Sequence, residues 1–371
     1  MKAASYLDSI QAYQPAIPIE VLAGQIGIPA DQIIKADANE NPYGASPKAA
    51  EALLHSIAPH LYPDPGAVAL CSQLSQFTGA PADQIMVGNG ADELIDIIMR
   101  LFLDPGDTLI DLPPTFAMYK LHAELTRAAV LEIPRRPDFS IDLPALLAAA
   151  SRPECKLVFL TTPNNPDGTL IPKEQIKLLL DLPIMLVVDE AYIEFSGSQA
   201  DFGASQSCIP WVTQVDNLIV LRTFSKWAGL AGLRVGYGVF PAWLMPILWK
   251  VKQPYNVNCA AQAAAAACLT DLPYYKTVLQ QISSERERMA AAIAALPGVA
   301  VVPSQTNFLL CQFKQASVKI IAAALRQKGI LVRAYDEPNC PQSLRISIMK
   351  PWQNDLILKA LEDNLSTGGN V

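Results

Sequence analysis

The chain has 371 residues, of which 51% are hydrophobic and 17% are charged, a composition typical of a globular protein with a large core. Its length exceeds what one hydrophobic core usually supports, so two domains are expected. The net charge of −7, without a basic cluster, argues against nucleic acid as a partner, and the apolar runs are too short to predict a membrane span.

Residues 1–43 are rich in proline and poorly periodic, which predicts an extended arm. From residue 44 to 255, short apolar runs alternate with helical patterns. The expected strands are 84–87, 108–112, 156–160, 183–188, 218–221 and 235–240, and the expected helices are 92–103, 118–127, 143–150 and 173–181. This alternation predicts a large α/β domain with a mostly parallel sheet flanked by helices. Ligands bind such sheets beyond the carboxyl ends of the strands.

Residues 256–371 have a different pattern and predict a smaller α+β domain. Helical patterns at 260–267 and 276–296 precede strands at 299–302, 307–313, 330–333 and 344–348, with helices at 317–328 and 353–364. The first helical pattern is rich in alanine, which is the best helix former.

The cysteines and histidines predict neither disulfides nor a metal site. The seven cysteines are spread without a CxxC pair, and only three histidines are present. The first residues lack the apolar core of a signal peptide. We therefore expect a reduced, cytoplasmic environment.

Lys226 follows an apolar run and stands among small residues, rather than in a charged face, in the stretch Leu221-Arg-Thr-Phe-Ser-Lys-Trp-Ala-Gly-Leu-Ala-Gly-Leu-Arg234. A lysine amine ordinarily has a pKa near ~10.4, but burial or a neighbouring cation lowers that pKa and lets the amine attack a carbonyl carbon. Ser225 and Arg234 add a hydroxyl and a guanidinium that suit a phosphate. These neighbours indicate pyridoxal-phosphate chemistry, whereas a lysine considered alone is more often a solvated loop charge.

Two further segments carry polar side chains directly after expected strands. Asp189 ends an apolar strand, and a buried carboxylate there needs a cationic partner such as a protonated pyridine nitrogen. Tyr192 follows three residues later, within reach of the same ring. The turn from Thr161 to Gly168 contains Asn165, a candidate donor to a ring oxygen, and Asn165–Pro166 is a candidate cis bond. Alternatively, Asp189 only caps a turn and the second segment is only a turn.

The segment Val87-Gly-Asn-Gly-Ala-Asp-Glu93 leads from an expected strand into an expected helix. Glycines let a backbone approach a phosphate, and the N–H groups at a helix N-terminus favour an anion. The backbone at Ala91 and Asp92 is therefore a candidate phosphate site. Simple helix capping by the acidic residues is the alternative, and the third glycine of a dinucleotide fingerprint is missing.

Eight segments, in order along the chain, resemble the histidinol-phosphate aminotransferase family of class-II, fold-type-I pyridoxal-phosphate enzymes. They are Asn39-Glu-Asn-Pro-Tyr-Gly, Tyr62-Pro-Asp, Asn89-Gly-Ala-Asp-Glu, Pro163-Asn-Asn-Pro-x-Gly, Asp189-Glu-Ala-Tyr, Thr223-x-Ser-Lys, Ala231-Gly-Leu-Arg and Leu344-Arg-Ile. The resemblance runs from about Tyr13 to Arg345, nearly the whole chain. It implies the fold-type-I large domain, pyridoxal 5′-phosphate as cofactor, and a homodimer with shared active sites.

The resemblance also implies a role for each matching residue. Lys226 would hold the cofactor covalently and then move the proton between two substrate positions. The other implied cofactor contacts are Asp189 on the pyridine nitrogen, Asn165 and Tyr192 on the ring oxygen, Phe116 stacked near the ring, Ala91, Asp92, Thr223, Ser225 and Arg234 on the phosphate, and Tyr62 from the other subunit. The implied substrate contacts are Tyr13, Asn39, Arg333 and Arg345.

The implied reaction transfers an amino group from L-histidinol phosphate to 2-oxoglutarate, so that one phosphorylated amine and one dicarboxylate keto acid are the small-molecule partners. Two arginines can serve either anion. An aromatic amino-acid aminotransferase and a threonine-phosphate decarboxylase remain alternatives on the same scaffold. A cofactor-sensing regulator is disfavoured, because few residues precede the arm. Three residues depart from the family pattern. Phe116 replaces a tyrosine near the cofactor, Asp167 replaces a threonine at a turn, and Met349 replaces a glycine near the substrate end.

Overall fold

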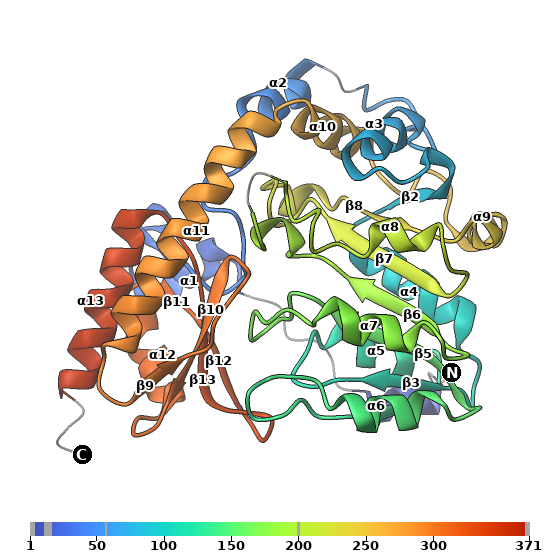
Figure 1. Ribbon diagram of the computed structural model, residues 1–371. Helices are drawn as coiled ribbons and strands as arrows, with labels where there is room; N and C mark the ends of the chain where they lie inside the picture. The colour runs from blue at the N-terminus through green and yellow to red at the C-terminus, as the bar shows by residue number, and fades with distance from the viewer. Residues whose placement is uncertain (1–3, 11–16, 56–57, 199–200, 368–371) are drawn as a thin grey trace.

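The computed structural model describes residues 4–10, 17–55, 58–198 and 201–367. A large sheet flanked by helices occupies one side of the molecule, and a smaller sheet with its own helices occupies the other (Figure 1). This is the expected fold class. The division at residues 43 and 255 stays a prediction.

The large sheet has seven strands in the order β2-β8-β7-β6-β5-β3-β4. Their bounds are β2 (Ile85–Gly88), β3 (Thr108–Asp111), β4 (Ala129–Glu132), β5 (Cys155–Thr161), β6 (Met185–Asp189), β7 (Leu218–Thr223) and β8 (Gly236–Val239). β8 is the one strand of the seven that runs antiparallel to the others, so the sheet is mostly parallel, as predicted. The edge strand β4 was not predicted, and none of its four residues is fully buried.

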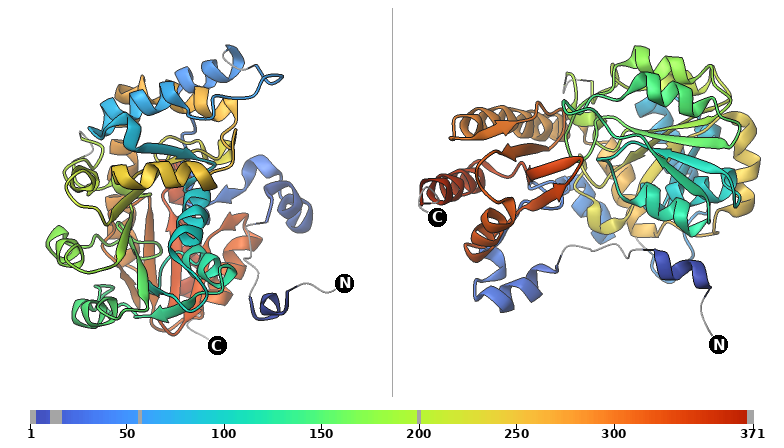
Figure 2. Two further views of the ribbon diagram at one scale, coloured as in Figure 1. Left: turned by 90° about the vertical axis from the view of Figure 1, so that its right-hand side faces the viewer. Right: turned by 90° about the horizontal axis from the view of Figure 1, so that it is seen from below.

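Helices cover both faces of this sheet (Figure 2). They are α4 (Ala91–Phe102), α5 (Met118–Leu125), α6 (Leu143–Ala150), α7 (Lys173–Leu179), α8 (Ile209–Val212) and α9 (Met245–Val251). Alternate residues of β5 enter separate cores: Val158 packs with the α6 and α7 side, and Phe159 packs with the α4 and α5 side. Because both faces are buried, the strands are apolar throughout.

The smaller sheet is antiparallel, with the order β12-β13-β10-β9. Its strands are β9 (Val299–Val301), β10 (Phe308–Phe313), β12 (Arg333–Glu337) and β13 (Cys340–Ser347), and α11 (Leu272–Ala294), α12 (Val318–Gln327) and α13 (Pro351–Thr367) accompany it. The short strand β1 (Ile34–Lys35) pairs with β11 (Ile330–Leu331). The segment before β1 contains the helix α1 (Ile19–Ile26), which the weak periodicity did not predict.

A third group of helices joins the two sheets. α2 (Pro47–His55), α3 (Val68–Thr78) and α10 (Cys259–Leu269) pack together, and α11 extends from them to the small sheet (Figure 1). Six short 3₁₀ helices complete the described elements: η1 (Ser5–Ser9), η2 (Ala30–Gln32), η3 (Ala82–Gln84), η4 (Ile193–Phe195), η5 (Ala231–Leu233) and η6 (Ala242–Leu244).

The described ranges contain no helix that combines the length and the apolarity of a membrane crossing. Within the same ranges, no cluster of three or more His, Cys, Asp or Glu side chains is arranged to hold a metal ion. All seven cysteines fall inside these ranges and are free thiols.

Candidate active site

The candidate site lies at the carboxyl ends of three adjacent parallel strands. Their register places Thr161 of β5 opposite Asp189 of β6, and Asp189 opposite Leu221 of β7. Thr223 ends β7, and Lys226 follows three residues later. The parallel pairing therefore brings together residues that the sequence separates by more than sixty positions.

Asp189 is buried, and its two carboxylate oxygens have different donors. The Tyr119 hydroxyl donates to Oδ2 at 2.6 Å, and the Ala191 backbone N–H donates to Oδ1 at 2.9 Å. Burial raises the pKa of Asp189 to about 6, against the lowering effect of the Tyr119 hydrogen bond. Within the described residues, no cationic side chain forms an ion pair with Asp189. The site thus contains a buried carboxylate that would gain from a cationic ligand.

Lys226 is partly buried, and its Nζ donates to the carbonyl oxygen of Ala38 at 3.2 Å. The same nitrogen lies 5.8 Å from the centroid of the Tyr192 ring. Burial lowers the pKa of this amine to about 8, and the neighbouring positive charges of Arg345 and Arg234 contribute. This is the lowered pKa that a nucleophilic lysine needs.

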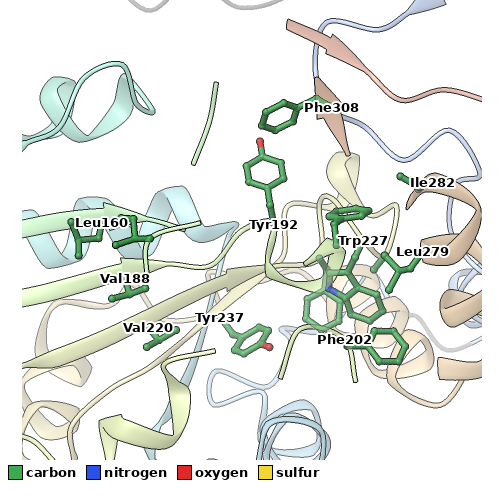
Figure 3. Packing of buried hydrophobic residues seen from close by; sticks show 14 of the residues in the cluster. Leu160, Val188, Tyr192, Phe202, Val220, Trp227, Tyr237, Leu279, Ile282 and Phe308 are labelled. Atoms are coloured by element: carbon green, nitrogen blue, oxygen red, sulfur yellow. The ribbon is translucent and has the colours of Figure 1, made fainter. Parts of the chain in front are cut away.

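Two hydrogen bonds fix the backbone that follows Lys226. Asn41 Nδ2 donates to the carbonyl oxygen of Trp227 at 2.8 Å, and the Tyr275 hydroxyl donates to the carbonyl oxygen of Ala228 at 3.1 Å. Figure 3 shows the indole of Trp227 packed beside Phe202, with side chains of α11 nearby. The lysine therefore extends from a rigid support.

Arg234 lies beside the N-terminus of α4. Its guanidinium donates to Asp92 Oδ2 at 2.8 Å and to Ser225 Oγ at 3.4 Å. A Cβ at Gly90 would lie 2.5 Å from the Arg234 guanidinium, and a Cβ at Gly236 would lie 2.5 Å from the Ala91 nitrogen. Glycine is therefore required at both positions for the close approach of these donors.

The Thr223 hydroxyl completes this group by accepting a hydrogen bond from the Ser225 backbone N–H at 3.0 Å. The structure thus brings together Ala91, Asp92, Thr223, Ser225 and Arg234, the five predicted phosphate-binding residues. Hydroxyls, a guanidinium and the start of a helix are the donors that a phosphate monoester favours.

Arg345 connects the small sheet to the loop after β5. Its guanidinium donates to Asn165 Oδ1 at 2.5 Å and to the Asp37 carbonyl oxygen at 2.6 Å. The Asn165–Pro166 peptide bond is cis, as predicted. Asn39 Nδ2 donates to the Tyr192 hydroxyl at 3.1 Å. Asn165, Tyr192, Asn39 and Arg345 therefore lie around Lys226, although their roles toward a ligand stay predictions.

Tyr192 follows the large sheet, and its side chain points toward the small sheet. Figure 3 shows its ring pointing toward Phe308 of β10, and the two rings meet edge to face with centroids 5.2 Å apart. Burial raises the pKa of Tyr192, which keeps its hydroxyl protonated near neutral pH.

The remaining predicted residues are placed differently. Phe116 is partly buried and meets Tyr119 edge to face at 5.6 Å. Arg333 begins β12, where it is exposed and paired in register with Arg345. Tyr62 is 82% exposed and stacks on Tyr255 at 4.5 Å, outside the group around Lys226. Tyr13 lies outside the described residues.

Asp167, which departs from the family pattern, does more than occupy a turn. Its carboxylate is fully buried and accepts hydrogen bonds from the Asn164 amide and from the backbone N–H and hydroxyl of Thr169. The negative charge of Asp167 partly offsets the lowering of the pKa that burial causes at Arg135. Asp167 therefore fixes the loop that carries Asn165.

Sequence reasoning missed several residues that support the site. Tyr119 donates to Asp189, the Ser347 hydroxyl donates to Asn39 Oδ1 at 3.0 Å, and Asn307 Nδ2 donates to the Asn39 carbonyl oxygen at 2.9 Å. Tyr119 belongs to an apolar helix face, and the other two residues are ordinary polar residues near strand ends. Only Tyr119 could have been singled out from the sequence, because a buried phenol needs a hydrogen-bond partner.

These residues fit pyridoxal phosphate on their chemistry. A buried carboxylate without an ion-pair partner suits a protonated pyridine nitrogen, an amine with a pKa of about 8 suits an aldehyde, and the Arg234 group suits a phosphate. The three features lie at one end of the same sheet.

Comparison with known proteins gives one consistent result. Residues 31–361 match the family model described as aminotransferase class I and II. The chain is 47% identical to the histidinol-phosphate aminotransferase of Roseiflexus castenholzii over 96% of both proteins. It is also 44% identical to the chloroplastic histidinol-phosphate aminotransferase 1 of Arabidopsis thaliana, over 96% of this chain and 84% of that protein.

The structural comparison agrees. The crystal structure of histidinol-phosphate aminotransferase from Sinorhizobium meliloti, in complex with pyridoxal 5′-phosphate, superposes with a TM-score of 0.89 at 29% identity, over 99% of this chain and 98% of that one. The expectations of an aminotransferase fold, of transferase chemistry and of pyridoxal phosphate as the cofactor are thereby confirmed. This chain belongs to the class I and II aminotransferases and, within them, to the histidinol-phosphate aminotransferase family.

Proposed function

We propose that this chain uses pyridoxal phosphate to transfer the amino group of L-histidinol phosphate to 2-oxoglutarate, which yields imidazole-acetol phosphate and glutamate in histidine biosynthesis. The observation that carries the chemistry is the placement of the Lys226 amine and the buried Asp189 carboxylate at the carboxyl ends of the adjacent strands β7 and β6. The 47% identity to a relative named for this reaction supports the choice of substrate.

The cofactor, when bound, supplies an electron sink that stabilises negative charge on the carbon bearing the amino group. Asp189 would pair with the protonated ring nitrogen and keep that positive charge in place. Ser225, Thr223 and Arg234 would bind the phosphate together with the N–H groups at the start of α4. Asn165 and Tyr192 would orient the ring oxygen from two sides.

Lys226 is the group that moves the proton. With a pKa of about 8, its amine is partly neutral near neutral pH and can accept a proton from the substrate carbon. The resulting ammonium can return that proton at a second position. Asn41 and Tyr275 hold the backbone next to Lys226, which limits its motion to the side chain.

Arg345 and Arg333 would bind the anionic groups of both substrates. Arg345 already directs two N–H donors at acceptors within the site, and it is 7% exposed. Arg333 lies opposite it on β12. Two guanidinium groups provide local positive charge in a protein whose net charge is −7. Tyr13 and Asn39 complete the proposed substrate contacts.

We further propose a homodimer in which Tyr62 reaches the cofactor phosphate of the partner subunit. Apolar side chains are exposed around this residue: Leu61, Val68, Trp249 and Tyr255. Trp249 lies close to Gly66, and Lys252 Nζ donates to the Pro65 carbonyl oxygen at 3.0 Å, so these residues form one surface. An exposed group of large apolar residues favours a protein interface.

The free thiols support the proposed cytoplasmic location.

A substrate panel tests this proposal. The kcat/KM of the cofactor-loaded protein is measured with histidinol phosphate, phenylalanine, tyrosine and threonine phosphate, following both glutamate formation and carbon dioxide release. We expect histidinol phosphate to lead by about 100-fold or more, because a polar site rejects analogues that leave its charges unpaired. A lead for the aromatic amino acids, or carbon dioxide from threonine phosphate, would establish one of the alternative activities instead.

The cofactor site has a separate test. Borohydride reduction followed by peptide mass spectrometry should locate the cofactor on Lys226 and on no lysine of a Lys226→Arg variant. Modification of another lysine in the wild-type protein would refute the proposed role of Lys226.

A further inference from the structure

We propose that Tyr119 is a positioning residue for the cofactor: its hydroxyl orients the Asp189 carboxylate and stabilises its negative charge where the ring nitrogen binds. The inference rests on the proposed function. It concerns a residue that the sequence motifs did not single out.

The Tyr119 ring is held rigidly in α5. It is fully buried, stacks on Phe159 with centroids 4.6 Å apart, and meets Phe116 edge to face at 5.6 Å. Because both contacts restrain the ring plane, the hydroxyl is fixed in position. It lies 2.6 Å from Asp189 Oδ2.

The direction of donation follows from counting protons. An ionised carboxylate only accepts hydrogen bonds, so the single Tyr119 proton is given to Asp189. The Tyr119 oxygen lies 2.9 Å from Thr161 Oγ1, and Thr161 must therefore donate to it. Thr115 Oγ1 donates to Asn164 Oδ1 at 3.0 Å, so no proton joins it to Thr161 Oγ1 at 3.3 Å. Thr161 therefore donates to Tyr119, and Tyr119 donates to Asp189.

The other groups around Asp189 do not replace this donor. The Ala191 backbone N–H binds only Oδ1. Asp92 at the start of α4 and Glu190 after β6 raise the pKa of Asp189, and the Tyr119 hydrogen bond gives the largest opposing contribution. Burial and the adjacent Asp189 raise the pKa of Tyr119 well above its usual range, so its hydroxyl stays a donor at all working pH values.

The test measures the binding of pyridoxamine 5′-phosphate, which has the ring and the phosphate of the cofactor but forms no covalent bond with Lys226. Its dissociation constant is determined from pH 5 to 8 for the wild type and for Tyr119→Phe. The ligand's own titration is common to both proteins and cancels in the comparison. We expect the pH at which affinity falls to rise by about one unit in the variant, the effect of losing one hydrogen bond to a charged group.

Tyr237→Phe is the matched control. It removes the hydroxyl of another buried tyrosine, whose charged neighbours include Arg222 and Glu194 but not Asp189. It should leave the pH midpoint unchanged, whatever its effect on the melting temperature. A purely structural role for Tyr119 would likewise lower the melting temperature without moving the midpoint.

A folded Tyr119→Phe protein with the wild-type midpoint overturns the inference while leaving the proposed function intact. Failure of the wild type to bind pyridoxamine phosphate at any pH would instead overturn the proposed function. Should Tyr119→Phe not fold, Thr161→Val removes the donor to Tyr119 and should raise the midpoint by a smaller amount. An unchanged midpoint in that variant also overturns the inference.

Discussion

The guanidinium of Arg345 donates a hydrogen bond of 2.5 Å to the amide oxygen of Asn165, although 180 residues separate them in the chain. Arg345 belongs to the small sheet, and Asn165 belongs to the loop after β5. A second donor of Arg345 binds the carbonyl oxygen of Asp37. Three distant segments therefore meet at one guanidinium, and its position depends on both sheets.

Loss of this guanidinium should weaken substrate binding. In Arg345→Gln, we expect KM for 2-oxoglutarate and for histidinol phosphate to rise by about 10- to 100-fold, the cost of losing a charge-assisted hydrogen bond. Arg100→Gln is the control, because Arg100 forms a surface pair with Asp96 on α4. Steady-state kinetics with each substrate varied in turn checks the effect. Unchanged KM values in Arg345→Gln would rule out this arginine as an anion-binding group.

The charge on Lys226 should cost stability in the cofactor-free protein. Its folded-state pKa of about 8 lies below the value of ~10.4 expected in the unfolded chain. The charge therefore lowers the free energy of unfolding by its full amount below pH 8, and this loss of stability disappears as the pH rises toward ~10.4. We expect Lys226→Met to raise the free energy of unfolding at pH 7 by about 2 kcal/mol.

Urea unfolding of the cofactor-free proteins at pH 7 and pH 10 measures this difference. The advantage of Lys226→Met should be smaller at pH 10. Lys156→Met, at an exposed position on β5, should show no comparable dependence on pH. A gain that is absent at pH 7, or equal at both pH values, would show that the amine is not destabilised by burial.

Close packing at Gly236 should matter for phosphate binding. A methyl group there would lie 2.5 Å from the Ala91 nitrogen and 3.0 Å from the Arg222 carbonyl oxygen, so the start of α4 would have to shift. We expect Gly236→Ala to raise the dissociation constant of pyridoxal phosphate by about 10-fold or more, since displaced N–H groups lose their hydrogen bonds. Gly232→Ala is the matched control, because no atom lies within 4 Å of its new methyl group. Equal affinities in the two variants would contradict this account.

Shared active sites predict complementation between two defective chains. In a mixed dimer of Lys226→Ala and Tyr62→Ala chains, one site receives both defects and the other receives none. Refolding an equal mixture should therefore restore about one quarter of the wild-type activity, since about half of the dimers are mixed and each has one intact site. Sedimentation should give a mass twice the 40.1 kDa of the chain. A mixture no more active than its separate components would exclude sharing through Tyr62.

Much of the site was predictable because its main residues occur in short segments with strong local signals. An apolar strand that ends in Asp189, and a Pro- and Gly-rich turn around Asn165, can be identified without any tertiary contact. The structure brings Lys226, Asp189, Asn165 and Arg234 to one end of the sheet, as expected. It could not be predicted that Asn165 and Tyr192 already bind Arg345 and Asn39, because those partners come from distant elements.

Other features gave weak local signals. The helix α1 is short and follows a proline-rich segment, and Gly27, with φ of 71°, ends it, so its eight residues showed no clear period. The edge strand β4 is only partly buried, and its apolar run is short. Tyr119 looked like one more core residue of an amphipathic helix. Its polar function depends entirely on which strand ends lie beside α5.

The sequence by itself determined the fold class and the cofactor chemistry and singled out Lys226 as the predicted cofactor lysine, because strand and helix periodicity and the residues after each strand are local properties. The tertiary structure alone decided the electrostatics of the site. Burial lowers the pKa of Lys226 and raises that of Asp189, and both effects arise from desolvation by residues remote in the chain. Tyr119 reaches Asp189 across 70 residues for the same reason: parallel strand pairing and helix packing, which no local pattern specifies, set that distance.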